Sequence, residues 1–218
     1  MNDLIQTFAV FALPILFAIT LHEAAHAYAA KYFGDSTAYQ LGRMSLNPIK
    51  HIDPVGTILI PVVLFFVQSP FLFGYAKPVP IDFGKLRNPK RDMAWVALAG
   101  PAANFVMALF WLLFSLALVV FQVAEPYFLK MARAGVETNL VIFAFNLFPI
   151  PPLDGGRIMT SILPNRQAHQ FSKLEPYGFF IVLALAYLHV LNFWMAPVMG
   201  LTQSALQLLL SPLTFLLG

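Results

Sequence analysis

The residues best suited to chemistry stand near the N-terminus, in the segment His22-Glu23-Ala24-Ala25-His26. Residues four apart lie on one face of a helix, so His22 and His26 can direct both imidazoles at one metal ion. Glu23 would lie beside that ion, where its carboxylate can take a proton from a zinc-activated water. Zinc lowers the pKa of its water to about 7, and the resulting hydroxide can attack a carbonyl carbon. The spacing therefore predicts a zinc hydrolase site with Glu23 as general base.

The surroundings of this motif strengthen the prediction. The same pattern occurs by chance in helices of soluble proteins, where it carries no catalysis. Here the two histidines and the glutamate interrupt an otherwise apolar helix, which we predict from Ile5 to Phe33. Ionisable side chains inside a membrane are energetically costly, and their usual roles there are functional.

A catalytic zinc ion uses three protein ligands and leaves a fourth position for water. Cysteine is absent, so the third ligand must be His, Asp or Glu. Asp154 is our candidate because it stands in a run rich in proline and glycine at the end of an apolar stretch. Irregular backbone at membrane depth is tolerated only where it lines a cavity or is buried in protein. An ordinary surface turn is the alternative interpretation of Asp154.

Composition places these residues in a membrane protein. Of the 218 residues, 59% are hydrophobic and only 11% are charged, whereas soluble domains usually carry about a quarter charged residues. Apolar runs long enough to cross a bilayer recur along the chain. The formal net charge of +3 does not indicate nucleic-acid binding, because the basic residues stand in loops without an aromatic platform.

The elements that must position the site follow from the apolar runs. We predict an all-α polytopic membrane protein with about five transmembrane helices, and a single membrane-embedded domain over residues 1–218 that carries the zinc site. Two of the predicted helices lie near the C-terminus, at about 177–194 and 196–217. A small membrane-associated β element is expected at Lys77–Ile81, where the prolines favour an extended chain. Its edge could pair with an unwound substrate strand.

The path of residues 55–73 decides whether the two parts of the zinc site can meet. If this segment crosses the membrane fully, the end of the first helix and Asp154 approach from opposite sides. If it is re-entrant, they meet at one depth. The re-entrant path also places Lys130 and Arg133 on one side of the membrane and the other 11 basic residues on the opposite side. We therefore predict a re-entrant segment, an outside N-terminus and an active site nearer the cytoplasm.

Three motifs in this order resemble the site-2 protease family of intramembrane zinc metalloproteases, in particular its compact bacterial-type members. They are His22-Glu23-Ala24-Ala25-His26, Gly100-Pro101-Ala102-Ala103-Asn104, and the run from Asn146 to Gly155 that contains Phe148-Pro149 and Leu153-Asp154. The resemblance implies that His22, His26 and Asp154 bind Zn²⁺ and that Glu23 activates the water.

The resemblance also implies that Asn104 and Asn146 lie near the site. There they could donate hydrogen bonds to the substrate backbone or to the oxyanion of the tetrahedral intermediate. Packing between helices is the alternative role for both asparagines. Larger relatives carry a PDZ or other soluble domain, and no segment of this sequence is long enough for one.

These observations predict an intramembrane zinc metalloendopeptidase of a bacterial cell membrane. Its expected partners are the lipid bilayer and transmembrane protein substrates, which it would cleave within or next to their membrane segments. Two alternatives place His and Asp in membrane helices without hydrolysis: a zinc or other metal transporter, and a catalytically silent scaffold that binds membrane segments.

Overall fold

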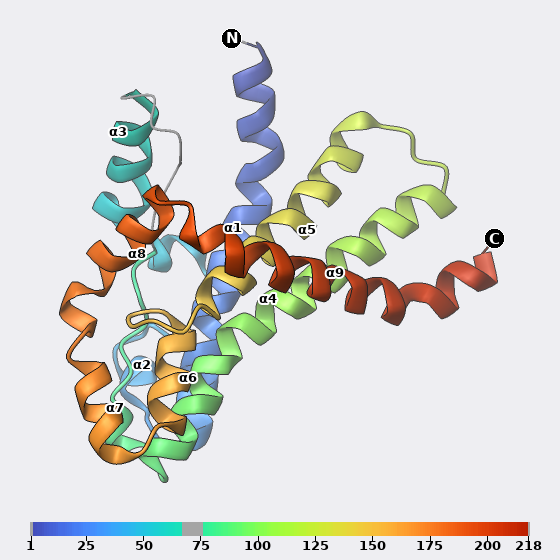
Figure 1. Cartoon of the computed structure of the whole chain (residues 1–218). Coiled ribbons are helices and arrows are strands. Elements are labelled where there is room, and N and C mark those ends of the chain that lie inside the picture. The colour runs from blue at the N-terminus through green and yellow to red at the C-terminus, as the bar shows by residue number, and fades with distance from the viewer. Residues whose placement is uncertain (1, 67–75, 218) are drawn as a thin grey trace.

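The computed structural model describes residues 2–66 and 76–217, and this part of the chain is mostly helical (Figure 1). Four short 3-10 or π turns lie between the α-helices, at Pro48–His51, Pro54–Leu59, Phe83–Lys85 and Glu175–Tyr177. The α-helices are α1 (Asn2–Phe33), α2 (Thr37–Gln40), α3 (Ile60–Phe66), α4 (Pro89–Val120), α5 (Pro126–Asn146), α6 (Asp154–Ile162), α7 (Asn165–Ser172), α8 (Gly178–Tyr187) and α9 (Val190–Leu217). The predicted helical class is confirmed.

Helices α1, α4 and α5 form the central bundle, α6 packs against α4, and α9 crosses α5 and α4 (Figure 1). Small residues fill the interfaces, for example Ala27 on α1, Ala108 on α4 and Ala144 on α5, all fully buried. Large apolar side chains point outward instead, with Phe110 64% and Phe193 85% exposed. Close packing through small residues is typical of membrane helices, whose apolar exterior faces lipid rather than water.

Three described helices are long and apolar enough to cross a membrane: Gln6–Phe33, Pro89–Val120 and Val190–Leu213. The expected number of about five is not confirmed. Helix α8 has only 10 residues, or roughly 15 Å, against a hydrocarbon core of about 30 Å. His189 has a positive φ of 57° and ends it, so the predicted helix at 177–194 is divided and α9 begins at Val190. Helix α5 carries three charged residues, Lys130, Arg133 and Glu137.

The first part of the predicted re-entrant segment is helical. A π-helical turn at Pro54–Leu59 leads into α3, and the Asp53 carboxylate accepts hydrogen bonds from the N–H groups of Val55 (3.0 Å) and Gly56 (2.7 Å) at its start. Residues 67–73 lie outside the described part of the chain. The re-entrant path therefore stays a prediction.

The predicted β element is not confirmed: residues 76–82 are coil, and the described residues contain no strand. The N–H groups of Lys77 and Val79 are used locally. Lys77 N–H donates to the carbonyl of His51 (2.9 Å) and Val79 N–H to Glu23 Oε2 (2.8 Å), while Pro78 and Pro80 have no N–H. Residues 77–80 thus have no free N–H to offer a substrate strand.

Polar groups hold the loops at the C-terminal end of α1. Arg87 donates from its side chain to the carbonyl oxygens of Tyr32 and Phe33, the last residues of the helix. The buried Asp35 carboxylate accepts hydrogen bonds from Thr37 N–H (2.9 Å), Thr37 Oγ1 (2.5 Å) and Asp82 N–H (2.8 Å). These contacts fix the loop that leads toward Val79 relative to α1.

Candidate zinc site

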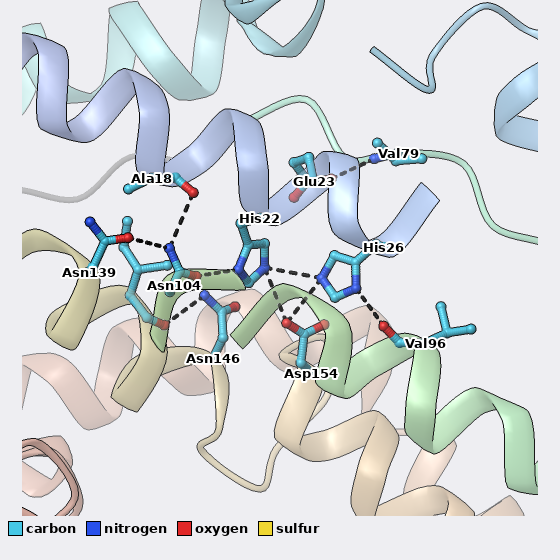
Figure 2. Close-up of polar contacts among 11 residues, drawn as sticks. Ala18, His22, Glu23, His26, Val79, Val96, Asn104, Asn139, Asn146 and Asp154 are labelled. Atoms are coloured by element: carbon cyan, nitrogen blue, oxygen red, sulfur yellow. Dashed lines mark hydrogen bonds and ion pairs between the residues drawn. The ribbon is translucent and has the colours of Figure 1, made fainter. Parts of the chain in front are cut away.

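Three potential metal ligands converge between α1 and the first turn of α6 (Figure 2). His22 and His26 lie one turn apart on α1, and Asp154 is the first residue of α6. Asp154 Oδ2 lies 3.2 Å from Nε2 of each histidine, and the two Nε2 atoms are 3.1 Å apart. All three side chains are buried. The structure thus brings together the three residues that the sequence predicted as ligands.

The proline- and glycine-rich run explains how Asp154 reaches α1. After α5 the chain makes a tight turn, and α6 starts directly against it. A Cβ atom on Gly155 would overlap the carbonyl of Leu147, and one on Gly156 would overlap the backbone of Pro151. Only glycine permits this close approach, which directs the Asp154 carboxylate toward the histidines. The alternative of an ordinary exposed turn does not fit, because Asp154 is buried.

Hydrogen bonds determine which imidazole nitrogens face the centre. His26 Nδ1 lies 2.7 Å from the carbonyl oxygen of Val96, which can only accept, so His26 Nδ1 carries the hydrogen. His22 Nδ1 lies 2.6 Å from Asn104 Oδ1 and carries a hydrogen for the same reason. In the neutral form of each ring the lone pair is therefore on Nε2, which points toward Asp154.

This arrangement fits a zinc ion. Three acceptor atoms face one another, and the buried Asp154 Oδ2 has no hydrogen-bond donor. One proton can bridge only two of these atoms, whereas a cation can bind all three. Two imidazoles and one carboxylate form a set that catalytic zinc uses. Space for the ion is provided by Gly100, since a Cβ there would lie 2.6 Å from Cε1 of both histidines.

Glu23 lies half-buried next to His22 in the sequence, but its side chain leans toward the coil at Val79 (Figure 2). Its Oε2 accepts the Val79 N–H bond, which fixes the orientation of the carboxylate. Within the described part of the chain its other oxygen, Oε1, is not hydrogen bonded. Glu23 therefore keeps one oxygen available for proton transfer.

The two predicted oxyanion donors differ in what they have left to donate. Asn104 is fully buried, and both hydrogens of its amide are used, by the Ala18 carbonyl (3.2 Å) and by Asn139 Oδ1 (2.9 Å). This geometry offers no donor for an oxyanion and favours a role in holding His22. Asn146 is half-buried and donates to the Ile142 carbonyl (3.0 Å) through one amide hydrogen, and among the described residues the second has no partner.

Sequence reasoning missed Asn139, which is fully buried and donates to the carbonyl of Gly135 (2.8 Å). A signal was present. Asn139 stands directly before the apolar run 140–145 and seven residues before Asn146, so both occupy the same helical face two turns apart. The Val96 carbonyl, which accepts a hydrogen bond from His26, cannot be identified from the sequence, because every residue has a backbone carbonyl.

Comparison with known proteins shows the family to which this chain belongs. Residues 122–189, which include Asp154, match the family described as "Peptidase family M50". The chain is 38% identical over 179 residues to "Putative zinc metalloprotease YwhC" of Bacillus subtilis, covering 78% of this chain and 77% of that protein. It is 31% identical over 180 residues to "Putative zinc metalloprotease Rip2" of Mycolicibacterium smegmatis, covering 82% and 67%. No solved structure matches. The similarity to YwhC over most of both chains and the match of the segment that carries Asp154 place this chain in peptidase family M50, the site-2 protease family.

Proposed function

We propose that the chain is an intramembrane zinc metalloendopeptidase that cleaves peptide bonds within or next to transmembrane segments of membrane proteins. Its family and its relatives, which are named zinc metalloproteases, make it a zinc-dependent peptidase. One observation supports cleavage inside the membrane. Nε2 of His22, Nε2 of His26 and Oδ2 of Asp154 converge inside a helical bundle whose exterior is apolar.

In this proposal His22, His26 and Asp154 hold Zn²⁺, which when bound polarises water and the substrate carbonyl. Glu23 acts as general base and takes a proton from the attacking water on Oε1, while Val79 N–H holds Oε2. As the water oxygen bonds to the carbonyl carbon and the C–N bond breaks, Glu23 returns the proton to the leaving amine. Asn146 supplies its free amide hydrogen to the carbonyl oxygen as negative charge develops there.

The chain is an integral membrane protein, and we infer that its site opens toward the cytoplasm of a bacterial cell. The two ends of α1 support this orientation. Lys130 and Arg133 lie beside Gln6 at the N-terminal end, whereas Arg87 and Lys85 lie at the C-terminal end, with the basic loops. His22 lies roughly 16 Å along the helix from Phe33 and roughly 24 Å from Gln6. The side with more basic residues is normally cytoplasmic.

Two inferences from the sequence remain part of this proposal. We infer that residues 1–218 act as one peptidase domain and that residues 55–73 re-enter the membrane. Labelling a cysteine at position 68 from outside the cell tests the second inference. Labelling there would contradict a re-entrant path that stays on the cytoplasmic side.

The decisive experiment compares purified wild-type protein with Glu23→Gln on a panel of single-span membrane substrates. Glutamine keeps the side-chain volume and still accepts the Val79 N–H bond, but it cannot act as a base. We expect cleavage by wild type only, equal zinc content in both proteins, and cut sites within or beside the membrane segment by mass spectrometry. Zinc transport that survives in Glu23→Gln without cleavage by either protein would favour the transporter. Substrate binding without cleavage by wild type would favour the scaffold.

A further inference from the structure

A chain of buried amide groups crosses three helices and ends at the zinc site. It begins at the Gly135 carbonyl on α5, which accepts from Asn139 Nδ2 (2.8 Å). Asn139 Oδ1 accepts from Asn104 Nδ2 on α4 (2.9 Å), and Asn104 Oδ1 accepts from His22 Nδ1 on α1 (2.6 Å). Figure 2 shows the bonds that join Asn139, Asn104 and His22, and both asparagines are fully buried. A polar chain at this depth needs hydrogen-bond partners, and here each amide nitrogen and oxygen has at least one.

The direction of every hydrogen bond in this series of amides follows from the Gly135 carbonyl at its end. The Gly135 carbonyl can only accept, so the NH₂ group of Asn139 must face it and the Asn139 oxygen must face Asn104. That oxygen and the Ala18 carbonyl (3.2 Å) then require the NH₂ group of Asn104. The oxygen of Asn104 is thereby left for His22. An asparagine amide can rotate by half a turn, and its partners decide which orientation it keeps.

The orientation matters because His22 has two tautomers. With Asn104 Oδ1 facing it, Nδ1 carries the hydrogen and Nε2 keeps the lone pair that a metal needs. If Asn104 rotated, its NH₂ group would face Nδ1 and favour the tautomer with hydrogen on Nε2. That tautomer cannot bind zinc through Nε2. The rotation would also place the Asn104 oxygen against the Ala18 carbonyl and Asn139 Oδ1, and Asn139 supplies one of these two opposing contacts.

We infer that Asn139 is a positioning residue for the zinc site, which acts through Asn104 to keep His22 in the tautomer that presents Nε2 to the metal. This inference rests on the proposed zinc site. It requires no contact of Asn139 with substrate or metal. It adds to the site a residue that Asn104 and His22 separate from the ion.

Substitutions at position 139 distinguish a role in orienting the Asn104 amide from a role in filling space. Leucine matches asparagine in shape but offers no acceptor to Asn104. Aspartate, which a dry apolar site keeps protonated, has the same shape and can still donate to Gly135 and accept from Asn104. We expect Asn139→Leu to weaken zinc affinity about 10- to 100-fold and Asn139→Asp to stay close to wild type. A space-filling role predicts zinc affinity close to wild type in both variants.

The measurement is competition for zinc with a chelator of known affinity, using full-length protein in detergent. Thr202→Val is the matched control, because Thr202 is a buried helical residue outside the site. Among residues 2–66 and 76–217 its hydroxyl donates only to the Val198 carbonyl (2.7 Å). Its zinc affinity should equal that of wild type. Wild-type affinity in Asn139→Leu would overturn the inference.

A second readout needs no variant at position 139. In zinc-free wild-type protein with ¹⁵N-labelled histidine, the His22 resonances, assigned with His22→Gln, should show hydrogen on Nδ1. Hydrogen on Nε2 would overturn the inference even if the position 139 variants fail to fold. Zinc affinity unchanged in His22→Gln would instead contradict the proposed zinc site itself. Loss of zinc in His22→Gln with full affinity in Asn139→Leu would reject the positioning role alone.

Discussion

Replacement of Gly100 by alanine is a sharp test of the zinc site, because it adds a single carbon atom. Gly100 lies in α4 directly against the two histidines of α1. The new Cβ would lie 2.6 Å from Cε1 of His22 and 2.6 Å from Cε1 of His26, and closer still to His26 Nε2. Carbon atoms in contact normally stay about 3.5 Å apart or more. The rings or the helices must therefore separate by about 1 Å.

This displacement is large for a metal site. Protein–zinc distances are held within about 0.2 Å, so a shift of about 1 Å prevents both histidines from binding one ion in the present arrangement. We expect Gly100→Ala to reduce zinc affinity by at least about 100-fold, or about 2.7 kcal/mol, and to abolish peptide cleavage. Alanine in place of glycine otherwise stabilises the interior of a helix by about 0.5–1 kcal/mol, so helix formation does not explain the loss.

The assay is zinc competition in detergent together with cleavage of a membrane substrate. Gly200→Ala is the control, since Gly200 also lies within a long apolar helix but a Cβ there meets nothing within 4 Å. That variant should keep wild-type zinc affinity and activity. Gly100→Ala protein that binds zinc as tightly as wild type would refute the close approach of α4 to the histidines.

Three further predictions concern the surroundings of the site. Val79→Pro removes the N–H that holds Glu23 and should lower kcat about tenfold with unchanged zinc affinity, whereas Val79→Ala should keep wild-type kcat. Gly135→Ala places a Cβ 2.5 Å from Cε2 of Trp111 and should lower the free energy of unfolding by about 1–3 kcal/mol. Adding Trp111→Leu to this variant should restore part of the loss, as chemical denaturation can measure. Burial alone would raise the pKa of Asp35, but hydrogen bonds from its neighbours outweigh burial and hold the pKa below 3.8. The ionised Asp35 thus stabilises the fold above that pH, and this stabilisation is lost as the pH falls below it. Asp35→Asn should therefore reduce the acid dependence of the thermal unfolding temperature, and an unchanged profile would contradict this role.

Where the sequence predicted well, the geometry is local or compositional. The four-residue spacing of His22 and His26 determines their common face in any helix, because the helical period is a property of the backbone. The helical class follows from long continuous apolar runs, which satisfy their backbone hydrogen bonds in lipid by forming helices. Asp154 could be proposed because proline and glycine at that place break a helix that composition would otherwise continue.

The sequence-based prediction was weaker wherever the conformation of a segment depends on the residues packed against it. The apolar run at 177–194 contains no proline or glycine beyond its start, yet His189 adopts a left-handed backbone and divides it. The prolines around Val79 indicated an extended edge, but the edge's donors are taken by Glu23 and by a neighbouring carbonyl. Neither partner can be identified from local sequence.

The sequence by itself determined the chemical groups: two imidazoles and a carboxylate on one helical segment, a distant aspartate, and an apolar chain to surround them. Only the tertiary structure decided how these groups are oriented. Asn104 and Asn139 stand 35 residues apart, and it is the packing of α1, α4 and α5 that joins their amides to His22. Hydrogen-bond direction is set by which partners meet in space, so the tautomer that makes His22 a ligand is a property of the fold.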